Sequence, residues 1–282
     1  MKNNSFNSND FSNYEVLTSK DEKFLRSCAL NGDEEVRRDV ALNENINKKI
    51  CSILIKDESA TVRRALAMNE SVSVLNLYTL AQDDDELVRS NAIRNRKFPD
   101  LYLVMLAKSP RRDVKLSVAK KGYLPNAVLD VFSNDPDPEF RKLAARGNLF
   151  YHPSDKFCFD PDEEVRVSYA RNEKASAKSL LILSRDKSMK VLRALSYNYA
   201  TTKEIRHNLA LAGDREIRIT ISRDSLYPET CKFLYELNDD IITYNLSNNY
   251  STPVDIIREL CKSNNESVKI NAEFHLKRLE NK

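Results

Sequence analysis

Glycine is scarce in this chain, with four residues among 282. Tight turns rely on the backbone freedom of glycine, so the scarcity disfavours a loop-rich or mainly β architecture. Tryptophan is absent, and no apolar run approaches the roughly 20 residues that a membrane-spanning helix needs. The start of the chain, MKNNSFNSNDFSNY, is too polar for a secretory signal peptide. We therefore expect a helical, cytoplasmic protein with no membrane partner.

Catalytic and metal-binding signatures are also missing. The five cysteines are widely spaced and form no C-x-x-C pair, which predicts reduced, mostly buried thiols: Cys28, Cys51, Cys158, Cys231 and Cys261. The three histidines lack the spacing of metal ligands, and there is no glycine-rich phosphate loop and no nucleophile elbow. We accordingly predict no catalytic residue, no metal and no cofactor.

The net charge of +3, from 45 basic and 42 acidic residues, favours neither nucleic acid nor a membrane as partner. What the sequence does contain is an internal repeat, in which an apolar residue followed by a basic one recurs with a period of roughly 26 residues. The first four intervals are identical, and the later ones vary slightly. We call the apolar residue of each pair the anchor. The anchors are Val36, Val62, Val88, Val114, Phe140, Val165, Leu192, Ile217 and Val268, with a degenerate copy at Ile241-Ile242.

Other residue types recur in the same register. Five residues after the anchor stands a small residue suited to close helix contact: Ala41, Ala67, Ala119, Ala145 and Ala170. Seven residues after it stands an asparagine that we interpret as a left-handed helix stop: Asn43, Asn69, Asn95, Asn172 and Asn248. Five residues before it stands an aspartate that we interpret as the N-cap of the next helix: Asp57, Asp83, Asp135 and Asp160.

A second apolar segment with helical spacing follows each asparagine, as in residues 72–82 and 175–185. Each repeat is thus two short helices that are marginal alone and must be stabilised by stacking. We predict an all-α fold, a right-handed α-solenoid of about ten two-helix repeats of roughly 26 residues. It would form a single domain over residues 21–282, preceded by a disordered or loosely attached tail over residues 1–20.

The pattern D-x-x-x-x-V-R-x-x-x-A-x-N resembles the HEAT-like repeat superfamily, and its short period resembles the leucine-rich repeat variant branch. The segments DPDPEFRKLAARGN (135–148) and DESATVRRALAMNE (57–70) carry the resemblance, which extends over about residues 30–280. The founding member of that branch has a cysteine-ligated iron–sulfur cluster before its repeats. Here Cys28 is the single cysteine among the first 50 residues, so we do not carry the cluster over. The resemblance specifies a fold and leaves the function open.

Two basic columns follow the repeat. The one directly after the anchor, which runs from Arg37 to Lys269, travels with the aspartates, and the resemblance implies an Asp–Arg ladder between neighbouring repeats. Six residues after the anchor stands a second column, Arg94, Lys120, Arg146, Arg171 and Arg223, which is either structural or a strip of exposed positive charge. Residues 89–121 also hold ten basic and two acidic residues, which indicates a phosphate-binding or acid-binding patch or a solvated rim.

These features predict a non-catalytic interaction scaffold that binds a partner protein along the concave face of the solenoid. The alternative is a nucleic-acid-binding solenoid, related by the same resemblance to HEAT-like glycosylases that remove alkylated bases from DNA. The catalytic signature of those glycosylases cannot be placed on this chain, and an enzyme of other chemistry is a third alternative. Oligomeric state and partner identity are not specified by the sequence. The candidate partner-binding residues are Arg94, Arg96, Lys97, Arg111, Arg112, Lys120, Lys121, Arg146, Arg171 and Arg223.

Overall fold

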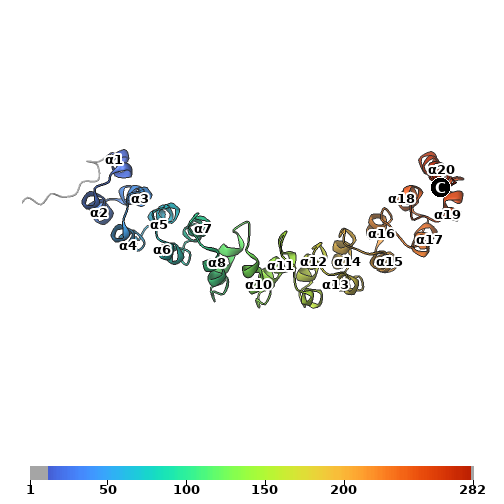
Figure 1. Ribbon diagram of the computed structural model, residues 1–282, viewed down its shortest axis with the longest axis horizontal. Helices are drawn as coiled ribbons and strands as arrows, with labels where there is room; N and C mark the ends of the chain where they lie inside the picture. Colours follow the sequence, from blue (N-terminus) through green and yellow to red (C-terminus); the bar gives the residue numbers. More distant parts are fainter. Residues whose placement is uncertain (1–11, 281–282) are drawn as a thin grey trace, which may run out of the picture. The chain divides into compact units, whose positions relative to one another are not determined.

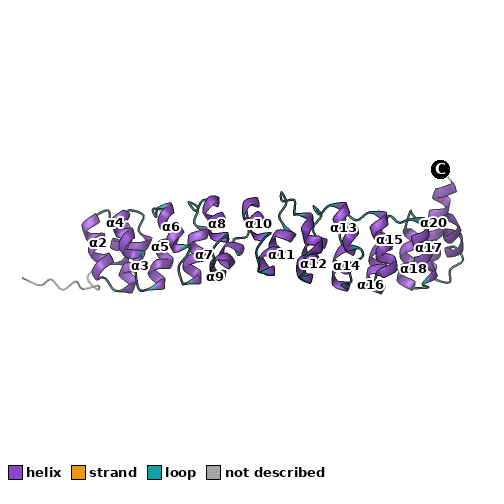
Figure 2. Ribbon diagram, turned by 90° about the horizontal axis from the view of Figure 1, so that it is seen from below, coloured by secondary structure: helices purple, strands orange, loops and turns teal. Residues whose placement is uncertain are grey.

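The computed structural model describes residues 12–280, in which α-helices and one short 3₁₀ helix are the regular elements and no strand occurs (Figure 2). Its contacts group the chain into two compact units, Met1–Val131 and Phe132–Lys282. Each unit is an all-α solenoid, as predicted. The single domain over residues 21–282 stays a prediction.

The first unit contains ten helices in its described part, and the last of them ends one residue beyond the unit. They are α1 (Asn13–Thr18), α2 (Glu22–Asn31), α3 (Glu34–Leu42), α4 (Lys48–Leu54), α5 (Ala60–Met68), α6 (Val74–Leu80), α7 (Glu86–Arg94), α8 (Asp100–Ala107), α9 (Arg112–Ala119) and α10 (Asn126–Phe132).

The second unit begins its repeats with α11 (Pro138–Arg146) and the 3₁₀ helix η2 (Asp155–Phe159). It continues with α12 (Glu163–Ala170), α13 (Ala177–Leu183), α14 (Met189–Ser196), α15 (Lys203–Ala212), α16 (Arg215–Ile221), α17 (Pro228–Glu236), α18 (Asp240–Asn248), α19 (Val254–Leu260) and α20 (Glu266–Glu280).

Within each unit the helices form two rows (Figure 1). The A helices, which carry the apolar anchors, pack side by side: α3, α5, α7 and α9 in the first unit, and α11, α12, α14, α16, α18 and α20 in the second. The B helices alternate with them along the chain: α2, α4, α6, α8 and α10, then η2, α13, α15, α17 and α19. Most of these helices have seven to nine residues, so the apolar faces buried between neighbours stabilise them, at about 1.5–3 kcal/mol per buried aliphatic side chain.

The anchor sits at the third position of each A helix, and this corrects the register at two repeats. The N-cap Ser188 accepts the N–H of Val191, and the N-cap Asp239 accepts the N–H of Ile242. Val191 is fully buried, and Ile242 is 1% exposed where Ile241 is 42% exposed. The predicted anchors Leu192 and Ile241 are therefore each wrong by one residue, and the anchors of these repeats are Val191 and Ile242. The repeat is more regular than predicted, since all intervals between anchors now agree to within a single residue.

The aspartate column does not cap the A helices, contrary to prediction. The N-caps stand two residues later, for example Ser59 after Asp57 and Asp85 after Asp83. Asp57 accepts the N–H of Ser59 at 2.9 Å and Asp83 that of Asp85 at 2.9 Å. Each aspartate of the column therefore orders the turn before the N-cap by accepting this hydrogen bond. Its carboxylate can still accept hydrogen bonds from another repeat.

The asparagine column does end the A helices, but not in a left-handed conformation. Asn43, Asn69 and Asn95 have φ values of −68°, −73° and −56°. Each is buried and donates its side-chain amide to main-chain carbonyls one repeat earlier, as Asn69 does to Ala41 and Asn43, both at 2.8 Å. Because buried carbonyls need partners, this ladder ties successive repeats together. The corrected register adds Asn198 and Asn249 to the ladder and removes Asn248, which is exposed.

The solenoid begins earlier than predicted. Helix α1 lies inside the segment that the sequence assigned to a tail, yet Val16 is buried and α1 packs against α3. Asn43 donates to the carbonyls of Val16 and Ser19 at 2.7 and 3.0 Å, as the other ladder asparagines do to the repeat before them. The prediction of a tail is therefore wrong for residues 13–18, while residues 1–11 lie outside the described part of the chain.

Candidate interaction site

The first basic column forms the predicted ladder between repeats. Arg37 donates two hydrogen bonds to Asp57, at 2.7 and 3.1 Å, and Arg63 donates two to Asp83, at 2.7 and 3.0 Å. The same paired geometry joins Arg141 to Asp160 and Arg166 to Asp186. Two parallel charge-assisted bonds fix both side chains, so this column has a structural role.

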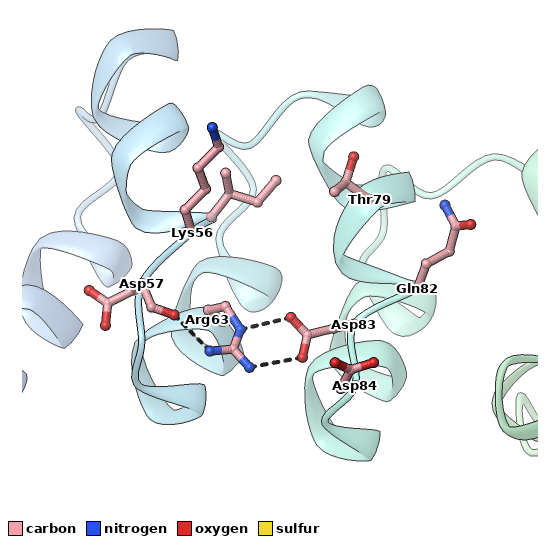
Figure 3. A pocket seen from close by; sticks show the side chains of 8 residues that line it. Lys56, Asp57, Arg63, Thr79, Gln82, Asp83 and Asp84 are labelled. Atoms are coloured by element: carbon pink, nitrogen blue, oxygen red, sulfur yellow. Dashed lines mark hydrogen bonds and ion pairs between the residues drawn. The ribbon is translucent and has the colours of Figure 1, made fainter.

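A pocket of about 500 Å³ surrounds one rung of this ladder (Figure 3). The Nη1 of Arg63 donates to the carbonyl of Asp57 at 2.7 Å while its other nitrogens face Asp83. The guanidinium thus already has partners on both sides. The rim adds Lys56, Thr79, Gln82 and Asp84, which do not form an arrangement of nucleophile, base and oxyanion donors.

The Asp–Arg ladder is interrupted where its arginine and aspartate are replaced in the sequence. Leu192 occupies the arginine position of the seventh repeat, and the aspartate position of the next repeat is Ala212, so both partners are replaced together. Arg193, predicted as a member of the ladder, instead pairs with Asp214, an N-cap, as Arg64 does with Asp85.

Arg218 is the next departure from the ladder. It keeps the predicted position but donates to the carbonyl of Ala210 at 2.9 Å, because Leu237 stands where the aspartate would be. The ladder therefore ends at the Arg166–Asp186 rung within this unit.

The second basic column is exposed on the A helices. The residue six positions after each anchor lies at or just beyond the C-terminal end of its helix, except in the longer α20. We call this set the surface row: Leu42, Met68, Arg94, Lys120, Arg146, Arg171, Tyr197, Arg223, Asn248 and Phe274. Lys120 pairs with Glu86 at 2.6 Å. The four arginines of the row make no hydrogen bond or ion pair with any described residue.

This freedom separates the surface row from the other arginines of the A helices. Arg37, Arg63, Arg64, Arg89, Arg141, Arg166, Arg193, Arg215, Arg218 and Arg278 all have partners. A cation in the last turn of a helix does stabilise the helix dipole, by about 0.3–1 kcal/mol. However, Leu42, Met68, Tyr197 and Phe274 occupy the same place in other repeats, so the fold does not require a cation there.

The basic patch of residues 89–121 is neutralised in part, at Arg89, Arg96, Arg111 and Lys120. Its buried members are Arg89, which contacts Ser117 and Asp113, and Lys115. Arg96 pairs with Glu70, and Arg111 pairs with Asp84 and Asp113 at 3.1 and 2.7 Å. The preceding acidic run supplies several of these partners, and Arg64 holds the pKa of Asp85 well below its usual range by hydrogen bonding.

The other candidates of this patch differ in their surroundings. Lys121 stands at the asparagine position of its repeat and donates to the carbonyl of Ile93 at 3.0 Å, so it substitutes for a ladder asparagine. Arg112 is exposed and has an interaction partner. Lys97 is exposed without one. The partner-binding role of all ten candidates stays a prediction.

Two grooves adjoin the surface row, one in each unit. In the first unit a space of about 380 Å³ lies beside Met68, Arg94 and Arg96. In the second unit a space of about 200 Å³ between α12 and α14 is lined by Glu164, Val167, Arg171, Lys190, Arg193, Ala194 and Tyr197. The second groove has an apolar floor, Val167 and Ala194, and a free guanidinium and an aromatic ring on its rim.

Buried polar groups elsewhere serve packing. Four cysteines are buried and unpaired, and burial raises the pKa of Cys28 and of Cys231 to about 11, which makes them poor nucleophiles. Tyr169 is buried beside the short η2 helix and donates to Asp155 at 2.9 Å, and burial raises its pKa to about 12.

Among residues 12–280 no group of three or more potential metal ligands is gathered. No helix in that range has the length and apolar character to cross a bilayer.

Two rows of short helices, repeated at a nearly constant period and linked by an asparagine and an arginine ladder, define an α-solenoid repeat protein. The chain is similar to a solved structure described as a leucine-rich repeat variant with a novel repetitive protein structural motif. The TM-score is 0.53 and the identity 24%, over 71% of this chain and 80% of that one. This likeness confirms the repeat-solenoid fold.

Two engineered repeat-like structures match less well. An engineered protein has a TM-score of 0.20 at 16% identity, over 92% of this chain and 57% of that chain. A designed armadillo repeat protein has a TM-score of 0.13 at 16% identity, over 95% of this chain and 98% of that chain. TM-scores this low do not establish a shared fold. No protein-family model matches the chain, and no curated protein matches it in sequence.

Proposed function

We propose that the protein is a non-catalytic interaction scaffold that binds a partner protein on the exposed face of its A helices, centred on the surface row of the second unit. One observation carries this proposal. The arginines of the A-helix row that have no partner in the described structure all belong to one position of the repeat, which leucine, methionine, tyrosine or phenylalanine occupies in other repeats.

The composition of this face supports a protein as the partner. In the second unit, exposed aromatic and aliphatic side chains accompany Arg146, Arg171 and Arg223 on the A helices: Tyr197, Ile241, Tyr244, Ile270 and Phe274. Tyrosine, phenylalanine and arginine are enriched at protein interfaces, where they supply large contact areas and charge-assisted bonds. Exposed apolar side chains grouped on one helix face are typical of protein interaction sites.

Nucleic acid is less well supported as the partner. The patch of residues 89–121 was its strongest sequence feature, but Arg89, Arg96, Arg111 and Lys120 are engaged by Glu70, Asp84, Glu86 and Asp113, and Lys121 by the carbonyl of Ile93. Phosphate-backbone binding depends on several uncompensated cations that release counterions. In this stretch Arg94, Lys97 and Lys108 are the exposed cations without a partner.

A matched pair of triple variants tests the proposal by affinity capture from the native cells. The first replaces Arg146, Arg171 and Arg223 by glutamine. The control replaces Arg185, Lys232 and Arg258, which are equally exposed and unpaired but belong to the B-helix side.

A protein retained by the wild type and the control, lost from the first variant, and bound again when purified supports the proposal. A partner that binds all three equally, or substrate turnover by the purified chain, contradicts it.

A further inference from the structure

The spacing of the surface row in the second unit limits the kind of chain that can bind there. Arg146 is the last residue of α11, Arg171 and Tyr197 are the C-caps of α12 and α14, and Arg223 lies two residues beyond the end of α16. These successive A helices pack side by side. Packed helices lie about 8–10 Å apart. A polyproline II segment advances about 3.1 Å per residue with three residues per turn, so its every third side chain points the same way about 9 Å further on. The spacing of the packed helices therefore matches the spacing of like-facing side chains in a polyproline II segment.

The order of residues along the row predicts the ligand's side chains. Two successive arginines, Arg146 and Arg171, come first, then Tyr197, then Arg223. A free guanidinium binds a carboxylate best, by two parallel charge-assisted bonds. Tyr197 is 58% exposed and borders the groove of about 200 Å³ whose floor is apolar, so an aliphatic side chain fits there.

The charges beside the row favour a narrow ligand. Nearer the start of the same A helices, each basic side chain is held by acidic ones: Lys142 by Glu139, Lys190 by Glu163 and Glu164, and Arg193 by Asp214 and Glu216. Arg146, Arg171 and Arg223 are thus the cations of this row without a partner among the described residues, whereas Arg218 of α16 is held by the carbonyl of Ala210. A nucleic-acid duplex, whose two grooves are about 12 and 6 Å wide, would place phosphates over the glutamates as well, whereas a single extended peptide would follow the arginines alone.

We propose that the face formed by Arg146, Arg171, Tyr197 and Arg223 binds an acidic segment of a partner protein in an extended, polyproline II-like conformation. Carboxylates at every third residue meet the arginines, and an apolar residue meets Tyr197. This inference rests on the proposed function, and it names the chemistry and the period of the partner.

Synthetic peptides test the period directly on the full chain by fluorescence anisotropy. The probe has about twelve residues, with aspartate at the first, fourth and tenth positions, leucine at the seventh and proline elsewhere. A control peptide has the same composition but its three aspartates adjacent.

We expect the periodic peptide to bind at least about tenfold more tightly than the control peptide, since one misplaced charge-assisted bond corresponds to about a factor of ten. The triple variant R146Q/R171Q/R223Q should lose this preference. Tyr197→Ala should raise the Kd of the periodic peptide and should reduce the dependence of binding on the leucine at its seventh position. The variant R185Q/K232Q/R258Q should bind as the wild type does.

Equal binding of both peptides, or undiminished binding by R146Q/R171Q/R223Q, overturns the inference. So does a single-stranded or duplex oligonucleotide that displaces the peptide at lower concentration than unlabelled peptide. If no peptide binds while affinity capture still loses a partner with R146Q/R171Q/R223Q, the inference fails and the proposed function stands. If capture is unchanged by that variant, the proposed function itself fails.

Discussion

The side-chain amide of Asn249 donates to the main-chain carbonyls of Ser222 and Asp224, in the preceding repeat, at 2.8 and 2.6 Å. Its carbonyl oxygen accepts the N–H of Ser251 at 2.9 Å. One buried side chain thus satisfies three main-chain groups of two different repeats. This relationship, repeated at Asn43, Asn69, Asn95, Asn172 and Asn198, couples each repeat to the one before it.

Replacing Asn249 by alanine is therefore expected to destabilise the protein, by about 2–4 kcal/mol, since unsatisfied buried groups cost about 1–3 kcal/mol each. The neighbouring Asn248→Ala is the matched control: Asn248 is exposed, and its loss should change stability by less than about 0.5 kcal/mol. Urea unfolding followed by circular dichroism measures both. A larger loss for Asn248→Ala would show that the register of this repeat is wrong.

The Arg63–Asp83 rung is expected to behave as a coupled unit. Alanine at either position leaves the other charge, at most 17% exposed, without its partner, and should cost about 2 kcal/mol. The double variant should cost less than the sum by about 1–2 kcal/mol, because both charges leave together, as they have at Leu192 and Ala212.

The exposed pair Glu259–Lys262 is the control cycle for this rung, with an expected coupling below about 0.5 kcal/mol. Additive losses at Arg63 and Asp83 would mean that the rung contributes nothing as a pair.

His275 is expected to make stability fall between pH 7 and pH 5. It stands at the asparagine position of the last repeat, and burial, with a smaller effect of Arg278, lowers its pKa below 6.5, against a hydrogen bond with the main chain of Ser247. The unfolded chain then takes up a proton near pH 6.5 while the folded chain does so only at lower pH, so stability is lost as pH falls through this window.

His275→Asn should remove that loss of stability and restore a ladder asparagine. The melting temperature at pH 7 and at pH 5 measures the difference for both proteins. Carboxylates do not explain a fall in this window, because those with lowered pKa, such as Asp85 and Asp214, stay ionised and their unfolded values lie near 4. Burial raises the pKa of Asp224, which makes stability rise as the pH falls. An equally steep fall in His275→Asn would exclude His275 as the cause.

Gly147 is expected to tolerate alanine less well than Gly122. Both have positive φ, 63° and 40°, which strains an L-residue. A Cβ on Gly147 would also lie 3.2 Å from Nδ2 of the ladder residue Asn172, whereas a Cβ on Gly122 has nothing within 4 Å. Gly147→Ala should thus lose about 1 kcal/mol more stability than Gly122→Ala in urea unfolding. Equal losses would indicate backbone strain alone.

The Asp–Arg ladder was implied by the resemblance to HEAT-like repeats, whereas the sequence by itself determined the solenoid, its two-helix unit and its period. These follow from local spacing: apolar residues at helical intervals need a partner surface, and a fixed period supplies that surface from the next repeat. The four most regular repeats, from Val36 to Val114, align on spacing alone because their intervals are identical.

Tertiary structure decided which of two adjacent apolar residues takes the anchor position. At Val191-Leu192 and Ile241-Ile242 both residues are apolar, so spacing could not choose, and the N-caps Ser188 and Asp239 made the choice. The asparagine column was visible in the sequence, but its donation to carbonyls of the preceding repeat depends on how the helices stack. Likewise the two basic columns have the same charge in the sequence, and only the structure showed that Arg63 is paired while Arg171 is free.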